Sequence, residues 1–239
     1  MSVLLLQLAG PLQSWGSASR YPRRSTESAP TKSGVVGLLA AAQGRPRTAD
    51  LSDLAALRFG VRIDQPGTRV RDFHTAHHQV SEKAMPVTER FYLADAVFLA
   101  AVEGERTLIE ELRAAVRTPH FLPFLGRRAC PPARPLDLGV RHDTGLETAL
   151  REHPWLASPW YRRQTARAAS EQLPVLLDAA PGDPPGDVVA DVPRSFDPRH
   201  RCYARRSVRR DTVPRPGVER TPATAVPPHD PMQPLKDDD

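Results

Sequence analysis

The feature that most constrains the fold is the apolar run Val3–Leu8, which lies near the start of the chain and ends at Gly10-Pro11. An apolar run without alternation is typical of a central strand, buried on both faces of its sheet. The segment lacks the basic region and the small-residue cleavage site of a signal peptide. No window reaches the ~20 apolar residues that a membrane span needs. We therefore expect a buried first strand in a cytoplasmic protein that has no membrane contact.

The remainder of residues 1–150 shows helix and strand patterns in turn. Apolar stripes at helical spacing predict helices at Lys32–Ala42 and Glu105–Arg117. Gly34 and Gly37 lie inside the first helix, where each costs roughly 1 kcal/mol relative to alanine, so we expect a close neighbour there. A helical turn is predicted at Leu51–Leu57, and strands are predicted at Arg58–Asp64, Ala94–Val102 and Leu136–Val140. This β-α-β-(insertion)-β-α-β order indicates an α+β, ferredoxin-like domain, the RRM-like pattern of RNA-recognition modules.

Three segments lie outside this pattern. Residues 66–93 are polar and basic but contain two β-like stretches, Arg69–Thr75 and Val87–Leu93, which predict an inserted hairpin. Residues 151–210 contain predicted strands at Leu173–Leu177 and Tyr203–Val208 and are expected to form a small β-rich C-terminal extension, after a helical turn near Glu147–Glu152. Residues 211–239 are proline-rich and end in Asp237-Asp238-Asp239, so we expect an irregular tail.

The charge of the chain favours an anionic partner. The formal net charge is +5 and the pI is near 9.7. Of the 33 basic residues only Lys32, Lys83 and Lys236 are lysines, which leaves 30 arginines. Arginine binds phosphate through two parallel hydrogen bonds and stacks on bases, whereas lysine acts as a point charge. A GC-rich genome, which favours arginine, alanine and proline codons, is the alternative explanation of this excess.

Cysteine and histidine give no sign of a metal or a cofactor. The two cysteines, Cys130 and Cys202, cannot form a disulfide framework and indicate a reducing cytosol. His74, His77 and His78 have no carboxylate or thiol at a diagnostic ligand spacing. We expect no metal and no cofactor, and Cys130 is interpreted as a packed residue. His74 as a lone general base for RNA cleavage stays open.

Several residues are suited to contact RNA. Gly126-Arg127-Arg128 predicts adjacent arginines on a tight turn, where they could clasp phosphates or form an ordinary solvated turn. Lys32 and Ser33 lie in the first turn of a helix, a natural anion site. Trp15, beside Gln13, suits stacking on an unpaired base, although a core tryptophan is the equal alternative. The full set of candidate RNA-binding residues is Gln13, Trp15, Arg20, Arg23, Arg24, Lys32, Ser33, Arg69, Arg71, Phe73, His74, Arg127 and Arg128.

Five segments, taken in order, resemble the signature of a known family. They are Leu8–Gly16 (LAGPLQSWG), Pro30–Leu39 (PTKSGVVGLL), Arg71–Thr75 (RDFHT), Arg90–Ala96 (RFYLADA) and Pro123–Pro131 (PFLGRRACP). The family is CasD, a subunit of the type I-E CRISPR surveillance complex, Cascade, within the RAMP superfamily. The resemblance extends from Val3 to about Gly139. Beyond residue 150 little matches, and the proline-rich tail departs from the pattern.

The resemblance implies a ferredoxin-like RAMP domain in which the insertion at 66–93 forms a protruding thumb. It implies a non-catalytic subunit that caps the 5′ handle of the CRISPR RNA and bridges the backbone subunits and the large PAM-recognising subunit in antiviral defence. Target DNA near the PAM-proximal end would be an indirect partner. The thumb would displace a nucleotide between handle and spacer, with Arg69, Arg71 and His74 near the backbone and Phe73 wedged against a base.

Two other functions remain open at this stage. A related subunit of type I-C systems cuts precursor RNA, so a metal-independent endoribonuclease is the main alternative. A general single-strand-binding module without preference for the handle is the third. The insertion has too few aliphatic residues to bury itself, so a thumb would need a partner to hold it. The alternative to a thumb is a mobile surface loop.

Overall fold

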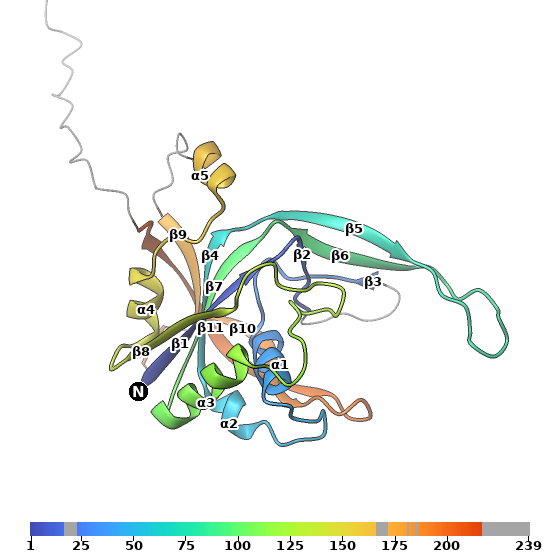
Figure 1. The fold of residues 1–239 in the computed structure, drawn as a ribbon, viewed down its shortest axis with the longest axis horizontal. Helices are drawn as coiled ribbons and strands as arrows, with labels where there is room; N and C mark the ends of the chain where they lie inside the picture. Colours follow the sequence, from blue (N-terminus) through green and yellow to red (C-terminus); the bar gives the residue numbers. More distant parts are fainter. Residues whose placement is uncertain (17–22, 166–171, 181, 185, 217–239) are drawn as a thin grey trace, which may run out of the picture.

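The computed structural model describes residues 1–16, 23–165, 172–180, 182–184 and 186–216. Its centre is a seven-stranded sheet with the order β10-β11-β9-β4-β7-β1-β8, in which neighbouring strands are antiparallel (Figure 1). Its strands are β1 (Ser2–Ala9), β4 (Arg58–Gln65), β7 (Val97–Gly104), β8 (Asp137–His142), β9 (Gln172–Asp178), β10 (Asp187–Ser195) and β11 (Cys202–Pro214). With the helices described below, the chain has a mixed α+β fold.

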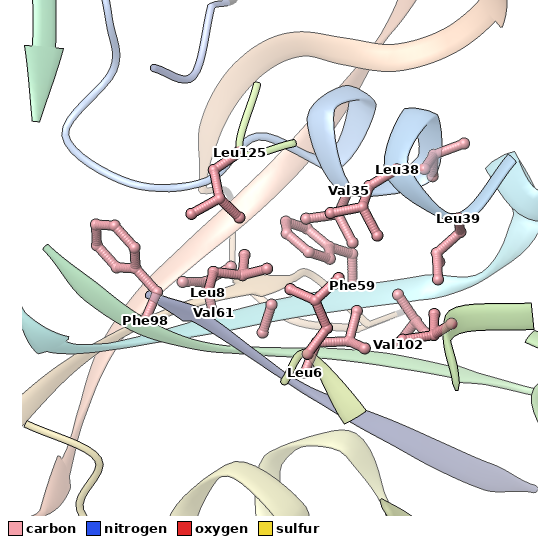
Figure 2. Close-up of a cluster of buried hydrophobic side chains, with 14 of the residues drawn as sticks. Leu6, Leu8, Val35, Leu38, Leu39, Phe59, Val61, Phe98, Val102 and Leu125 are labelled. Atoms are coloured by element: carbon pink, nitrogen blue, oxygen red, sulfur yellow. The ribbon is translucent and has the colours of Figure 1, made fainter. Parts of the chain in front are cut away.

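Strand β1 lies between β7 and β8, and all eight of its residues are buried. Its even-numbered leucines belong to one core cluster and Val3 and Leu5 to another. Residues of α1 (Lys32–Ala42), α2 (Ser52–Ala56) and α3 (Arg106–Arg117) complete the first cluster. Figure 2 shows Val35 and Leu39 of α1 beside Leu6 and Leu8 in that cluster. The apolar run therefore forms a central strand, as its sequence predicts.

The second face of the sheet is covered by α4 (Leu146–Glu152), followed by the partly buried Trp155 and Leu156. A further helix, α5 (Pro159–Thr165), has no buried residue. Helices α1 and α3 lie close to the positions expected from the apolar periodicity, and α2 and α4 lie where the sequence predicts helical turns. None of the helices in the described residues has the length and apolar character needed to cross a membrane.

An ion pair lies in the interior beside α4. Arg62 of β4 and Asp64 have side chains with 0% exposure, and their atoms Nε and Oδ1 are 2.6 Å apart. The Arg62 guanidinium also donates to the carbonyl oxygens of Leu150, His153 and Pro154 at 2.5–2.8 Å. Burial, together with the Arg62 cation, lowers the pKa of His153. This pair fixes the segment after α4 to the centre of the sheet.

The C-terminal strands extend the same sheet. Strand β9 pairs with β4, β11 pairs with β9, and β10 forms the edge. The sequence predicted strands at 173–177 and 203–208, but the structure adds β10 and continues β11 to Pro214. The expectation of irregular structure after residue 210 is therefore wrong for Asp211–Pro214, which pair with Gln172–Val175. Residues 217–239 lie outside the described part of the chain.

A smaller sheet lies beside the large one. Its central strand is β6 (Thr88–Ala94), which pairs along its length with β5 (Thr68–His74) and, on the other side, with the short strands β2 (Leu12–Gln13) and β3 (Arg23–Arg24). In Figure 1 the β5–β6 hairpin extends far from the large sheet. It lies in the predicted insertion, between β4 and β7, the neighbours at the centre of the large sheet.

The two glycines inside α1 meet different neighbours. A β-carbon at Gly34 would lie 2.7 Å from Trp15 Cε3, whereas at Gly37 it would lie 3.5 Å from the ring of Phe196. We expect Gly34→Ala to lower the free energy of unfolding by about 1–3 kcal/mol, because the clash with a buried indole outweighs the gain in helix propensity.

Gly37→Ala is the matched control, since its contact is of ordinary length. It should raise stability by up to about 1 kcal/mol in the same denaturant titration. Equal effects of the two substitutions would show that the Trp15 contact does not account for Gly34.

Candidate nucleic-acid interface

The β5–β6 hairpin gathers arginines and aromatic rings on one face. In the antiparallel register Arg71 lies opposite Phe91 and Phe73 opposite Glu89, and β3 places Arg23 beside Glu89. Directly opposed residues point to the same side of a sheet, as do residues two apart. We name this surface the arginine–phenylalanine face, and its members are Arg23, Arg69, Arg71, Phe73, Glu89 and Phe91.

Guanidinium groups stack on the rings of this face. The guanidinium carbons of Arg23 and Arg69 lie 5.0 and 4.9 Å from the centroid of Phe91, and that of Arg71 lies 4.9 Å from the centroid of Phe73. Such cation–π contacts hold the side chains extended over the strands. Phe73 itself is 53% exposed, so its ring is available to a partner.

The charge of the face is positive. Its acid, Glu89, contacts Arg23 at 3.6 Å and Arg71 at 3.4 Å, distances of loose ion pairs. The side chains of Arg23 and Arg71 are 69% and 54% exposed, and solvent screens such pairs strongly. The face thus carries one carboxylate and three guanidinium groups; Glu89 contacts those of Arg23 and Arg71, and the guanidinium of Arg69 donates to Ser25 Oγ.

The turn at Gly126 is built as predicted, but its two arginines differ. Gly126 has φ +84°, and a β-carbon there would overlap the carbonyl oxygen of Ser14. Arg127 lies over Tyr92 with its guanidinium carbon 4.7 Å from the ring centroid, and it donates to the carbonyl oxygen of Arg24 at 3.0 Å. Arg127 therefore ties the turn to β3, while Arg128 is exposed.

Two buried guanidinium nitrogens near this turn have no hydrogen-bond partner in the described structure: Nη1 of Arg127 and Nε of Arg90. Both residues lie against β6, since Arg90 belongs to the strand and Arg127 covers Tyr92. Burial raises the pKa of the nearby Cys130 thiol, with Arg127 opposing the shift, so this cysteine is a packed group rather than a nucleophile.

Trp15 and Gln13 are core residues, and their predicted contacts with bases are wrong. The Trp15 side chain is fully buried and its indole N–H donates to Gln13 Oε1 at 3.1 Å. The Gln13 amide in turn donates to the carbonyl oxygens of Leu8 and Ala96. The alternative of a core tryptophan is the one that the structure supports.

Lys32 and Ser33 lie at an anion site, but the anion comes from the protein. The Lys32 backbone N–H donates to Asp191 Oδ2 at 2.8 Å, and its Nζ lies 2.9 Å from Asp178 Oδ2. Arg206 bridges the same two carboxylates, with Nη1 2.5 Å from Asp178 and Nε 2.6 Å from Asp191. The predicted phosphate site is therefore occupied by a buried network between α1 and the C-terminal strands.

The remaining candidates divide as follows. Arg24 is exposed on β3, and His74 lies on β5 with Nε2 3.3 Å from Asp72 Oδ2. Arg20 lies outside the described residues. His77 and His78 occupy the end of the hairpin, and no cluster of three or more potential metal ligands occurs in the described ranges. The sequence-based list missed Arg90, Phe91 and Tyr92. Alternation along the predicted strand places Phe91 on one face and Arg90 and Tyr92 on the other, so this pattern could have identified them.

Known proteins resemble the chain over most of its length. The family model described as CRISPR-associated protein (Cas_Cas5) matches residues 3–209. The CRISPR system Cascade subunit CasD of Escherichia coli (strain K12) is 35% identical over 185 residues, which cover 69% of this chain and 82% of the relative. A crystal structure of a Cas protein matches with a TM-score of 0.71 and 40% identity, over 89% of this chain and 95% of the other. A chain from a CRISPR RNA-guided surveillance complex matches with a TM-score of 0.72 and 34% identity, over 90% and 91%.

Proposed function

This chain belongs to the Cas5 family of CRISPR-associated proteins, and from that premise we propose that it is the guide-RNA-binding subunit of a type I-E surveillance complex that caps the 5′ handle of the CRISPR RNA. The similarity to a Cascade subunit and to a chain of an RNA-guided complex supports this role. A cytoplasmic location follows from the role, because the guide is transcribed and assembled there.

The topology supports the assignment of a ferredoxin-like RAMP domain. The chain order β1-α1-β4-β7-α3-β8 combines with the sheet order β4-β7-β1-β8, so that the two halves of a β-α-β-β-α-β repeat interleave. The β5–β6 hairpin would be the thumb, since it joins the two middle strands of that repeat and projects from them (Figure 1).

The observation that carries the proposal is the arginine–phenylalanine face. Single-stranded RNA is bound by stacking of splayed bases on aromatic or guanidinium planes and by cations along the backbone. Phe73 and Phe91, each covered by an arginine, supply both kinds of contact on one strand pair. Arg24 and His74 lie on the opposite side of the same strands, because each is next in sequence to a member of the face, and Arg128 is exposed on the turn after Gly126.

Partner subunits would contact the end of the hairpin. Val80, Met85 and Val87 are 88%, 47% and 52% exposed there, apolar area that is suited to burial against protein. We propose a neighbouring backbone subunit as the partner of this apolar area, and the large PAM-recognising subunit as the second protein partner of the chain. In this role target DNA near the PAM-proximal end is an indirect partner, reached through the guide and the large subunit.

The endoribonuclease alternative rests on the pair His74 and Asp72. A carboxylate beside an exposed imidazole can orient a general base. Incubation of the purified protein with repeat RNA separates the two functions, because a binding subunit shifts the RNA intact and a nuclease shortens it. We expect intact RNA, and unchanged guide maturation in cells carrying His74→Ala. Precursor that accumulates in that variant alone would favour the nuclease.

We expect the combined substitution of Arg23, Arg69 and Arg71 by alanine to weaken handle RNA binding about 10- to 100-fold. Loss of three phosphate contacts should also lower the slope of log affinity against log salt concentration by about 2, since each contact on a single strand contributes about 0.7. Fluorescence anisotropy across a salt series measures both quantities.

The matched control replaces three exposed arginines on other surfaces, Arg47, Arg141 and Arg163, with alanine. It removes the same net charge and should leave the slope unchanged. If the two triple variants lose affinity and slope equally, the arginine–phenylalanine face is not the RNA site.

A further inference from the structure

A second basic surface lies at the end of the β10–β11 hairpin, away from the arginine–phenylalanine face. Residues 194–205 contain four arginines and one histidine, and all five of these side chains are exposed. We name this segment the C-terminal basic tip, and its cations are Arg194, Arg199, His200, Arg201 and Arg205. In Figure 1 the hairpin (orange) extends past α1, separate from the β5–β6 hairpin.

The side chains of the four arginines of the tip have no ion-pair partner among the residues that the structure describes. Many arginines of the chain are paired with carboxylates, among them Arg45, Arg58 and Arg113. By contrast, the guanidinium groups of the tip make no ion pair or hydrogen bond with any part of the chain that the structure describes. The acid of the segment, Asp197, accepts the backbone N–H of Arg199 at 2.8 Å and closes the turn. Within the described residues the tip therefore carries an excess of positive charge, four arginines against the single carboxylate of Asp197.

The tip is held firmly at its base. Phe196 packs over Gly37 of α1 and lies edge-on to Tyr203, with ring centroids 6.5 Å apart. Below it, Arg206 and Asp191 pair in the buried network with Lys32. A cationic hairpin rooted in this way presents its arginines without ordering a loop first, which favours binding of an anion.

The chemistry of the tip differs from that of the arginine–phenylalanine face. On the latter, guanidinium groups cover exposed or half-buried rings, as single-strand binding requires. At the tip, Tyr203 is 36% exposed and engaged with Phe196, and no guanidinium lies over either ring in the described structure. Arginines without a stacking platform suit a regular phosphate backbone rather than splayed bases.

We propose that the C-terminal basic tip binds the phosphate backbone of duplex DNA directly. A two-stranded β-ribbon fits the major groove of B-form DNA, where arginines reach the flanking phosphates in bidentate fashion. The major groove of A-form RNA is too deep and narrow to admit it. The inference rests on residues 194–205 alone and holds whether or not the β5–β6 hairpin binds the guide.

The test measures binding of the full-length protein to a duplex DNA, a duplex RNA of the same sequence and the corresponding single strand. The variant carries Arg194→Ala, Arg199→Ala, Arg201→Ala and Arg205→Ala. The control carries Arg47→Ala, Arg134→Ala, Arg141→Ala and Arg163→Ala, four exposed arginines elsewhere with the same loss of charge. We expect the variant to lose about tenfold or more in affinity for duplex DNA, and about 3–4 in salt slope, from roughly 0.9 per contact. The control should keep its slope.

Two further readouts make the result decisive. Replacing the same four arginines with lysine should preserve the salt slope, because the charge remains, while losing the bidentate contacts. Affinity for the handle RNA should stay unchanged in all three variants. The proposal is overturned if the variant and the control lose affinity for duplex DNA equally, or if the protein binds duplex RNA more strongly than duplex DNA. It is also overturned if the variant's complex lacks a protein subunit while its affinity for DNA is unchanged.

Discussion

Replacing Arg62 with alanine is expected to lower the free energy of unfolding by about 3–5 kcal/mol, enough to unfold a large share of the molecules of a marginally stable domain. The substitution leaves the carboxylate of Asp64 buried without its cation. It also removes the donor to three backbone carbonyl groups, that of Leu150 in α4 and those of His153 and Pro154 after it, which have little access to water to replace it. The segment that carries Trp155 should then detach from β4. A denaturant titration followed by tryptophan fluorescence would detect this as exposure of tryptophan to solvent.

Arg151→Ala is the control for this prediction. Arg151 pairs with Glu147 one helical turn away, and the two side chains are 50% and 40% exposed. Its loss should cost about 0.3–0.5 kcal/mol. If Arg62→Ala costs no more than Arg151→Ala, the buried pair is not what holds the segment after α4.

Asp191→Ala, on the edge strand β10 of the large sheet, is expected to have a comparable effect, a loss of about 3–5 kcal/mol in the free energy of unfolding. Asp191 is 1% exposed and neutralises Arg206, and it also accepts the backbone N–H of Lys32 at the start of α1. Without Asp191, two cations, Lys32 and Arg206, share the single carboxylate of Asp178. One positive charge then remains without a counter-ion in a largely buried site. Hydrogen exchange at the Lys32 amide should accelerate along with the loss of stability.

The comparison for Asp191 lies on the same strand. Asp187 pairs with Arg210, with side chains 56% and 72% exposed, so Asp187→Ala should cost less than about 1 kcal/mol. A Lys32 amide that stays protected in Asp191→Ala would contradict the assignment of Asp191 as the anion at the start of α1.

The sequence predicted the central elements well because their signals are local. The apolar run of β1 and the helical stripe of α3 each contain enough residues to define period and burial. Strand β10 was missed because Asp187–Ser195 has acids, a proline and an arginine where an apolar run would be expected. Pro193 and the bulges of β10 are typical of an edge strand, which needs no continuous apolar signal.

The candidate site was predicted in part for a related reason. Alternation along β5 predicts that Arg69, Arg71 and Phe73 share one face. The register of β3 and β5 against β6 then brings Arg23 to the same face. The partners of Lys32 are Asp178 and Asp191, which lie 146 and 159 residues further along the chain, and no local motif reveals them. Gln13 and Trp15 form a hydrogen bond with each other inside the core. The sequence alone does not distinguish this arrangement from an exposed pair that contacts RNA bases.

The order of strands in the large sheet also determines how the chain has to be made. Strand β4 ends at Gln65, yet its second neighbour, β9, begins only at Gln172. At ~5–20 residues per second a ribosome needs roughly 5–20 s to cover that interval. Throughout that interval the edge of β4 that later pairs with β9 stays unpaired, and such an edge can pair with a neighbouring nascent chain. Production of this subunit should therefore be sensitive to chaperone supply, and fragments that stop before β9 should aggregate rather than accumulate as a smaller folded domain.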